Sequence, residues 1–208
     1  MKVLKTIEDV QSEILSIKKN GKRIGFVPTM GALHQGHISL VKKSRAENDI
    51  SVVSIFVNPT QFNEKQDYEN YPKNLESDIN FLKKEGCDLI FIPTSDIMYP
   101  DGLEETIDFD PGFLDTILEG EKRPGHFKGV ATVVKKLFDI IRPHSAYFGQ
   151  KDYQQTLVIR KLVYDFRIPV KLIICPIIRE VSGLAMSSRN SLCWVNCLLF
   201  SSSRSIAV

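Results

Sequence analysis

Short apolar runs separated by longer polar segments are the main pattern of this sequence. Five of the runs are rich in β-branched residues and bounded by Gly, Pro or Asn, which is typical of buried strands. They cover residues 23–27, 51–57, 88–92, 146–148 and 170–174. Between them, apolar positions recur with a helical period, most clearly in residues 129–141. A weaker helical face joins Leu75, Ile79 and Leu82.

Strands that alternate with helices predict an α/β fold, because parallel strands need crossover connections. We expect an open parallel sheet with helices on both faces, in which ligands bind beyond the carboxyl ends of the strands. The candidate site is therefore formed by the loops after Val27, Val57, Phe148 and Ile174. Residues 1–190 are assigned to this domain, whereas residues 191–208 have neither helical nor alternating order.

Composition and charge narrow the class of protein. The chain has 208 residues, 43% apolar, and a formal net charge of +2, which gives no case for a nucleic-acid or membrane partner. Charged residues interrupt the apolar positions at the N-terminus, unlike a secretory segment, so a cytoplasmic location is expected. The four cysteines are scattered, which favours reduced thiols. A zinc site at Cys193 and Cys197 is disfavoured because no second ligand pair is nearby.

The loop of residues 28–37, PTMGALHQGH, follows a strand and opens a helix. A helix N-terminus offers free backbone N–H groups to phosphate, and Gly31 and Gly36 allow a close approach. His34 and His37, three residues apart, can direct two imidazoles at the same phosphates and stabilise a departing pyrophosphate. This pattern favours adenylyl transfer. The alternatives are two surface histidines at a helix start, or a zinc pair.

Two further loops carry polar side chains suited to ligand binding. Asn58 and Gln61 offer neutral amides that can recognise hydroxyl and carboxyl oxygens, although an ordinary turn also explains them. After the later strand, Lys151 can neutralise phosphate charge, and Gln155 lies one helical turn beyond it. Asp152 can hold ribose or metal, or simply cap the helix with Lys151 in solvent.

Basic residues also occur beside glycines in two loops. Residues 123–129, RPGHFKG, open the most regular helix and suit either an anion site or a solvated loop. In residues 179–190, two hydroxyls and Arg189 can close over phosphates through charge-assisted hydrogen bonds. The alternative there is a polar surface loop.

Six segments, in order and spacing, resemble the pantothenate synthetases, the pantoate:β-alanine ligases of the nucleotidyltransferase superfamily. They are PTMGALHQGH, FVNPTQF, YPKNLESD, RPGHFKGVATVVKKLF, FGQKDYQQ and GLAMSSRN. The resemblance runs from the first residues to about Asn190 and is far more specific than a lone HxGH motif. It implies a Rossmann-like nucleotidyltransferase domain. It also implies a two-step reaction with ATP and magnesium (Mg2+), in which pantoyl adenylate forms and β-alanine then displaces AMP to give pantothenate.

The resemblance also assigns roles to residues. The residues it implies for ATP binding are Met30, Gly31, Ala32, Leu33, His34, Gln35, Gly36, His37, Gly149, Gln150, Lys151, Asp152, Ile178, Met186, Ser187, Ser188 and Arg189. Those for pantoate and β-alanine are Asn58, Gln61 and Gln155. The expected catalytic residues are His34, His37, Lys151 and Arg189, with His37 as the acid. A homodimer is implied as well. Asp78 and Asp152 are candidate magnesium contacts, but the metal ligands stay unassigned.

Two features depart from the family pattern. Ser182 stands where the family usually has an acidic residue, and residues 191–208 differ from the family's C-terminal lid domain. We therefore interpret this tail as a remnant or aberrant replacement of a largely missing lid, and expect weak ligation because water would reach the adenylate. Its apolar residues are expected to promote association; they are Leu192, Trp194, Val195, Leu198, Leu199 and Phe200.

Two other functions compete with this ligase hypothesis. The first is an adenylyltransferase with a different acceptor, although a phosphorylated acceptor would need more basic residues around Gln61 than the sequence offers. The second is an inert nucleotide-binding fragment, which would bind ATP without releasing pyrophosphate when pantoate is added.

Overall fold

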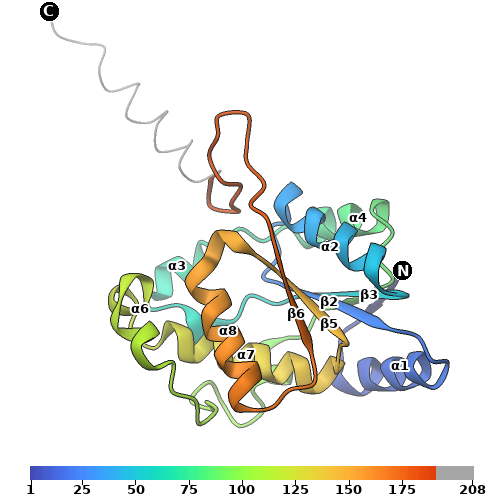
Figure 1. Ribbon diagram of the computed structural model, residues 1–208, viewed down its shortest axis with the longest axis horizontal. Helices are drawn as coiled ribbons and strands as arrows, with labels where there is room; N and C mark the ends of the chain where they lie inside the picture. The colour runs from blue at the N-terminus through green and yellow to red at the C-terminus, as the bar shows by residue number, and fades with distance from the viewer. Residues whose placement is uncertain (191–208) are drawn as a thin grey trace, which may run out of the picture.

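The computed structural model describes residues 1–190, which form one parallel sheet of six strands covered by helices (Figure 1). The strand order is β1-β4-β3-β2-β5-β6. The strands are β1 Lys2–Leu4, β2 Ile24–Thr29, β3 Ile50–Ile55, β4 Leu89–Phe91, β5 Ser145–Gly149 and β6 Lys171–Cys175. The predicted α/β fold with a parallel sheet is therefore confirmed, and the residues of the tail, 191–208, lie outside the described part of the chain.

All five predicted strands are present, with ends that differ by one or two residues. The N-terminal strand β1 was not predicted, because three residues are too few to show a pattern. It pairs in parallel with β4, through Lys2 and Leu89, and so lies at one edge of the sheet. β6 forms the opposite edge and pairs with β5 along its length.

The helices lie on both faces of the sheet. The α-helices are α1 Ile7–Lys19, α2 Gln35–Glu47, α3 Lys65–Glu69, α4 Leu75–Lys84, α5 Ser95–Met98, α6 Leu118–Lys122, α7 His126–Ile141 and α8 Tyr153–Asp165. Short 3-10 helices are η1 Pro59–Gln61, η2 Gly112–Thr116 and η3 Gln150–Asp152. In Figure 1, α2 and α4 lie on one side of the strands and α1, α7 and α8 on the other.

This layering matches two apolar cores. One core packs α1, α7 and α8 against the sheet and includes the large ring of Phe26. The other packs α2 and α4 against the opposite face, around Val27 and Leu82. Neighbouring residues of β2 thus alternate between the two cores, as the pleat of a strand requires.

The helical predictions need two corrections. α7 begins at His126, three residues before the predicted start, and Leu75 of the predicted α4 face is 41% exposed, whereas Leu82 is fully buried. α1 was not predicted although its buried residues, Val10, Ile14 and Ile17, have helical spacing.

Among the described residues, 1–190, there is no helix of the length and apolarity that a membrane crossing needs.

Candidate active site

A cavity of about 690 Å³ opens at the carboxyl ends of β2, β3 and β5, where the sheet topology predicts a ligand. The structure brings most of the sequence-predicted site residues to its walls. These are Met30, His34, His37, Asn58, Gln61, Gly149, Lys151, Asp152, Gln155, Met186, Ser187, Ser188 and Arg189. The predicted residues that are not on the walls are Gly31, Ala32, Leu33, Gln35, Gly36, Gln150 and Ile178.

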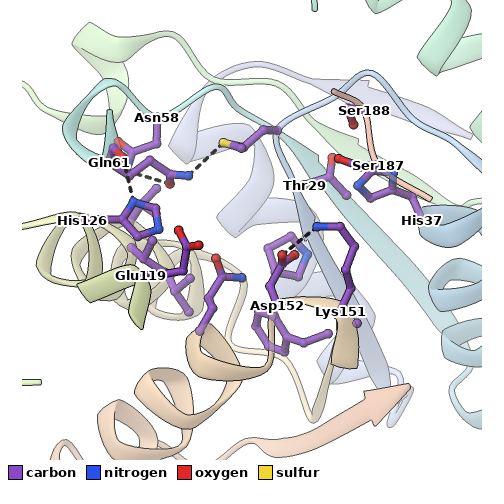
Figure 2. A pocket seen from close by; sticks show the side chains of 18 of the residues that line it. Thr29, His37, Asn58, Gln61, Glu119, His126, Lys151, Asp152, Ser187 and Ser188 are labelled. Atoms are coloured by element: carbon purple, nitrogen blue, oxygen red, sulfur yellow. Dashed lines mark hydrogen bonds and ion pairs between the residues drawn. The ribbon is translucent and has the colours of Figure 1, made fainter. Parts of the chain in front are cut away.

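Figure 2 shows that polar groups gather at two ends of this cavity. His37, Lys151 and Ser187 lie at one end, which we call the histidine end. Asn58, Gln61 and His126 lie at the other, which we call the amide end. A wall of apolar side chains from α7 completes the cavity; it consists of Phe127, Val130, Val133, Val134 and Leu137. The cavity therefore offers cationic and imidazole groups to one part of a ligand and neutral amides to another.

The two histidines at the start of α2 hold each other in place. His34 Nδ1 accepts a hydrogen bond from the backbone N–H of Gly36 at 3.1 Å, and His37 Nδ1 accepts one from the N–H of His34 at 3.3 Å. Their ring centroids are 4.1 Å apart. Because each Nδ1 is an acceptor, each neutral ring carries its proton on Nε2.

Electrostatics keep both rings uncharged. Burial, His34 and Lys151 lower the pKa of His37 to about 3, and burial with the Lys151 ammonium lowers the pKa of His34. At neutral pH, His37 is therefore not an imidazolium that could release a proton. Its expected role as an acid is limited to donating a hydrogen bond from Nε2–H. A neutral donor can stabilise negative charge that develops on phosphate without itself losing a proton.

The loop before α2 is held by a buried carboxylate. Asp78, on α4, accepts hydrogen bonds from the N–H groups of Ala32 and Leu33 at 2.8 and 2.7 Å. Gly31 has a φ of +84°, and a Cβ there would lie 3.0 Å from Asp78 Oδ2, so glycine is required. Burial raises the pKa of the Asp78 carboxyl, and the two backbone donors oppose that rise.

This arrangement bears on two of the expected roles. The N–H groups of Ala32 and Leu33 are not free to bind phosphate, because Asp78 already accepts from both. The Asp78 carboxylate anchors the loop through these two hydrogen bonds, and its role as a magnesium contact stays a prediction. It positions the two histidines that follow.

Lys151 and Arg189 are both ion-paired to nearby carboxylates. Lys151 Nζ lies 2.7 Å from Asp152 Oδ1, and Arg189 Nη2 lies 2.8 Å from Asp67 Oδ2. Both pairs are partly exposed, so each is weak and can exchange its carboxylate for a phosphate at small cost. The Arg189 guanidinium also lies 5.6 Å from the ring centre of Tyr71, a wall residue.

The loop after β6 is tied to the histidine end. Ser188 Oγ donates to the carbonyl oxygen of Ala32 at 2.9 Å. The carbonyl of Ile178 accepts from the N–H of Met186 at 3.0 Å, so Ile178 supports the loop while Met186 lines the cavity. Ser182 lies at the exposed turn of this loop.

At the amide end, His126 and Arg123 hold the backbone of Gln61. His126 Nδ1 donates to the Gln61 carbonyl oxygen at 2.8 Å, because that oxygen can only accept, and Arg123 Nη2 donates to the same oxygen at 3.2 Å. Burial lowers the pKa of His126, so its ring is neutral. Both residues belong to the segment RPGHFKG, for which the sequence allows either an anion site or a solvated loop. Arg123 and His126 of this segment line the cavity.

Other wall residues were missed by sequence reasoning. Tyr71 belongs to the YPKNLESD segment, whose resemblance was recognised without assigning it a role. Thr29 ends β2, two residues beyond the predicted strand, and Glu119 lies on α6, which has no recognisable pattern. Only the tertiary fold brings Glu119 to the cavity. Among the described residues, no group of three His, Cys, Asp or Glu side chains is placed to hold a metal, and Cys193 and Cys197 lie outside them.

The close packing of α7 on η1 gives a first testable prediction. A Cβ on Gly129 would overlap the carbonyl oxygen of Thr60 and lie 3.1 Å from Gln61 Cα. Gly129→Ala should therefore cost about 1–3 kcal/mol of unfolding free energy and displace Gln61. The check is urea unfolding together with the KM for pantoate, the acid that the family resemblance implies. A folded variant with unchanged KM would contradict this role of Gly129.

The buried histidines give a second prediction, on stability against acid. The pKa of His37 is about 3 in the folded protein and near 6.5 in the unfolded chain. The stability that depends on His37 being neutral is therefore fully present above about pH 6.5. That contribution is lost as the pH falls toward 3, with a slope of about 1.4 kcal/mol per pH unit. His37→Gln should reduce the measured slope of unfolding free energy by about this amount. Equal slopes for the parent and the variant would disprove the assignment.

Comparison with known proteins places this geometry in a family. The sequence profile described as Pantoate-beta-alanine ligase matches residues 2–194. The chain is a member of this family. All the wall residues discussed above lie within the matched range. The two-ended cavity therefore lies in the part of the chain that matches the pantoate-β-alanine ligase family.

Relatives and solved structures support the assignment. The pantothenate synthetase of Aliivibrio fischeri is 50% identical over 196 residues, which are 94% of this chain and 67% of that protein. The pantothenate synthetase of Cytophaga hutchinsonii is 54% identical over 89% of this chain and 65% of that protein. This pantoate-β-alanine ligase chain thus spans about two thirds of the length of these relatives.

A crystal structure of the pantoate-β-alanine ligase from Francisella tularensis, complexed with beta-gamma ATP and β-alanine, superposes with a TM-score of 0.88. Its sequence is 49% identical, and the match covers 92% of this chain and 73% of that one. The predicted resemblance and the predicted nucleotidyltransferase-like fold are confirmed.

Proposed function

We propose that this chain catalyses the ATP-dependent condensation of pantoate with β-alanine to pantothenate, through a pantoyl adenylate. The observation that carries the proposal is that one cavity combines a phosphate-suited histidine end with a neutral amide end. Family membership supports it, as does the related ligase crystallised with beta-gamma ATP and β-alanine. Residues 1–190 are proposed to be the domain that binds ATP and pantoate.

In the first step, a pantoate carboxylate oxygen attacks the α-phosphorus of ATP, and the bond to the β-phosphate oxygen breaks. The leaving pyrophosphate gains negative charge. The Nε2–H donors of His34 and His37 and the ammonium of Lys151 are proposed to stabilise this charge. Arg189 joins them after exchanging Asp67 for phosphate.

At the other end, Gln61 and Gln155 are proposed to bind pantoate, with Asn58 supporting Gln61. Neutral amides can orient a carboxylate and hydroxyls without pairing the carboxylate with a cation, which would make it a weaker nucleophile. The apolar wall from α7 suits the carbon skeleton of the acid. Met30, whose sulfur lies 3.0 Å from Gln61 Nε2, is proposed to lie beside the reacting groups.

In the second step, the amine of β-alanine attacks the carbonyl carbon of the adenylate, the amide bond forms, and AMP leaves with the electrons of the carbon–oxygen bond. The amine proton passes to solvent. Excluding water from the adenylate favours this reaction over hydrolysis.

Magnesium, a homodimer and a cytoplasmic location are proposed from the family resemblance alone. Magnesium is usually held by phosphate oxygens with one or two carboxylates. Of the candidates, the Asp152 carboxylate fits, because it lines the cavity beside Lys151. When bound, the ion would neutralise phosphate charge.

The decisive experiment measures pyrophosphate release from ATP with and without pantoate, followed by product formation when β-alanine is added. Release that depends on pantoate, and pantothenate formed only with β-alanine, would support the proposal. Release with a different acid would favour the adenylyltransferase with another acceptor. ATP binding without release would favour the nucleotide-binding fragment.

A further inference from the structure

Tyr99 is a buried tyrosine that follows α5 and contacts Asn58 and Thr60 at the amide end of the cavity. Its side chain is 3% exposed, and its hydroxyl donates to Asn58 Oδ1 at 2.7 Å. The same hydroxyl lies 3.3 Å from Thr60 Oγ1. Lys136 Nζ lies 5.0 Å from the centre of the Tyr99 ring, a cation–π contact that helps to fix the ring. The same ammonium pairs with Glu105 at 2.7 Å. Tyr99 does not line the cavity.

The hydroxyl of Tyr99 determines which way the amide of Asn58 points. Asn58 Nδ2 faces the carbonyl oxygen of Gly129 at 3.3 Å, and this oxygen can only accept. With a donor on Oδ1 and an acceptor beside Nδ2, rotating the Asn58 amide by 180° would break both interactions. Asn58 is 1% exposed, so water cannot replace them.

The orientation of Asn58 is passed on to Gln61. Asn58 Nδ2 also donates to Gln61 Oε1 at 3.3 Å, and Gln61 Nε2 lies 3.0 Å from the sulfur of Met30. If the Gln61 amide rotated, its Nε2 group would face the Nδ2 donor of Asn58. The chain of hydrogen bonds therefore gives Gln61 one fixed polarity, with its donor group at the Met30 side of the cavity.

We propose that Tyr99 is a positioning residue that acts through Asn58 to fix the amide polarity of Gln61, and so sets the affinity for the acid substrate. This inference rests on the proposed function, in which Gln61 binds pantoate. Thr60 Oγ1, at 3.2 Å from Asn58 Oδ1, is a weaker second donor that limits the effect of losing Tyr99. ATP, bound at the histidine end, is unaffected.

The test uses Tyr99→Phe, which removes only the hydroxyl. Pantoate and a non-hydrolysable ATP analogue are titrated separately by calorimetry, and pyrophosphate release gives KM and kcat. We expect pantoate to bind about tenfold more weakly, with affinity for the ATP analogue unchanged. Tyr164→Phe, which removes a hydroxyl from a side chain 83% exposed, is the control and should bind both ligands as the parent does.

A double variant separates positioning through Gln61 from a general loss of structure. In a Gln61→Met background, Tyr99→Phe should weaken pantoate binding no further, since Gln61 carries the effect. Unchanged pantoate affinity in Tyr99→Phe, or a full tenfold loss that persists beside Gln61→Met, would overturn the inference but leave the proposed function. If the parent chain binds no pantoate, the proposed function fails, and the inference fails with it.

Discussion

Replacing His37 by alanine is expected to slow pantoate-dependent pyrophosphate release by about 10²–10³-fold, the usual cost of removing one preorganised donor to a developing charge. The neutral ring donates through Nε2–H, and its Nδ1 is already used by the backbone N–H of His34. The loss should therefore appear in kcat for the first step, measured by single-turnover release, rather than in the affinity for pantoate.

His37→Gln is the informative comparison. A glutamine amide nitrogen can lie near the position of Nε2 and donate as the imidazole does, although the acceptor for the His34 N–H is lost. Rates between those of the parent and His37→Ala are expected. If glutamine and alanine are equally slow while both variants fold, the ring must act as a proton carrier instead of a neutral donor.

Replacing Lys151 by methionine is expected to lower the rate of the first step by about 10²-fold and to weaken ATP binding, because a charge-assisted contact to phosphate is removed. Stability should change little, since the Lys151–Asp152 pair is partly exposed and such pairs contribute at most about 1 kcal/mol. ATP titration and single-turnover release, with thermal unfolding alongside, measure these effects.

The chain offers a closely matched control for Lys151. Lys161 lies on α8 and pairs with Asp165 at 2.6 Å, with a similar degree of exposure, but it is not part of the cavity wall. Lys161→Met removes the same charge and the same kind of ion pair. Equal losses of activity in the two variants would mean that net charge, and not the position of Lys151, controls the rate.

The sequence predicted the sheet and the histidine end well because both depend on local patterns. Strand runs with glycine-bearing loops, and His34 and His37 at a helix start, are visible within about ten residues. The same locality explains the missed strand β1, whose three residues have meaning only beside β4. Such a strand cannot be predicted from sequence patterns alone, because only its pairing with β4 defines it.

The amide end could be predicted only in part, because its order depends on contacts between distant segments. Gln61 was selected from its motif, but the roles of Tyr99 and Asp78 arise from hydrogen bonds that span 41 and 46 residues. Neither has a local signal, since a buried tyrosine or aspartate looks the same in sequence whether it anchors a loop or merely fills space. Their positions in the fold assign their roles.

The two ends of the cavity are encoded by largely separate stretches of the chain. The loops after β2, β5 and β6 supply the histidine end, while η1, α6 and the start of α7 supply the amide end. During evolution or laboratory selection, substitutions around Gln61 and His126 can thus alter which acid is accepted without disturbing the groups that activate it. Met30 contacts Gln61 and adjoins the loop that Asp78 anchors. Substitutions that displace Met30 would therefore also disturb the histidine end.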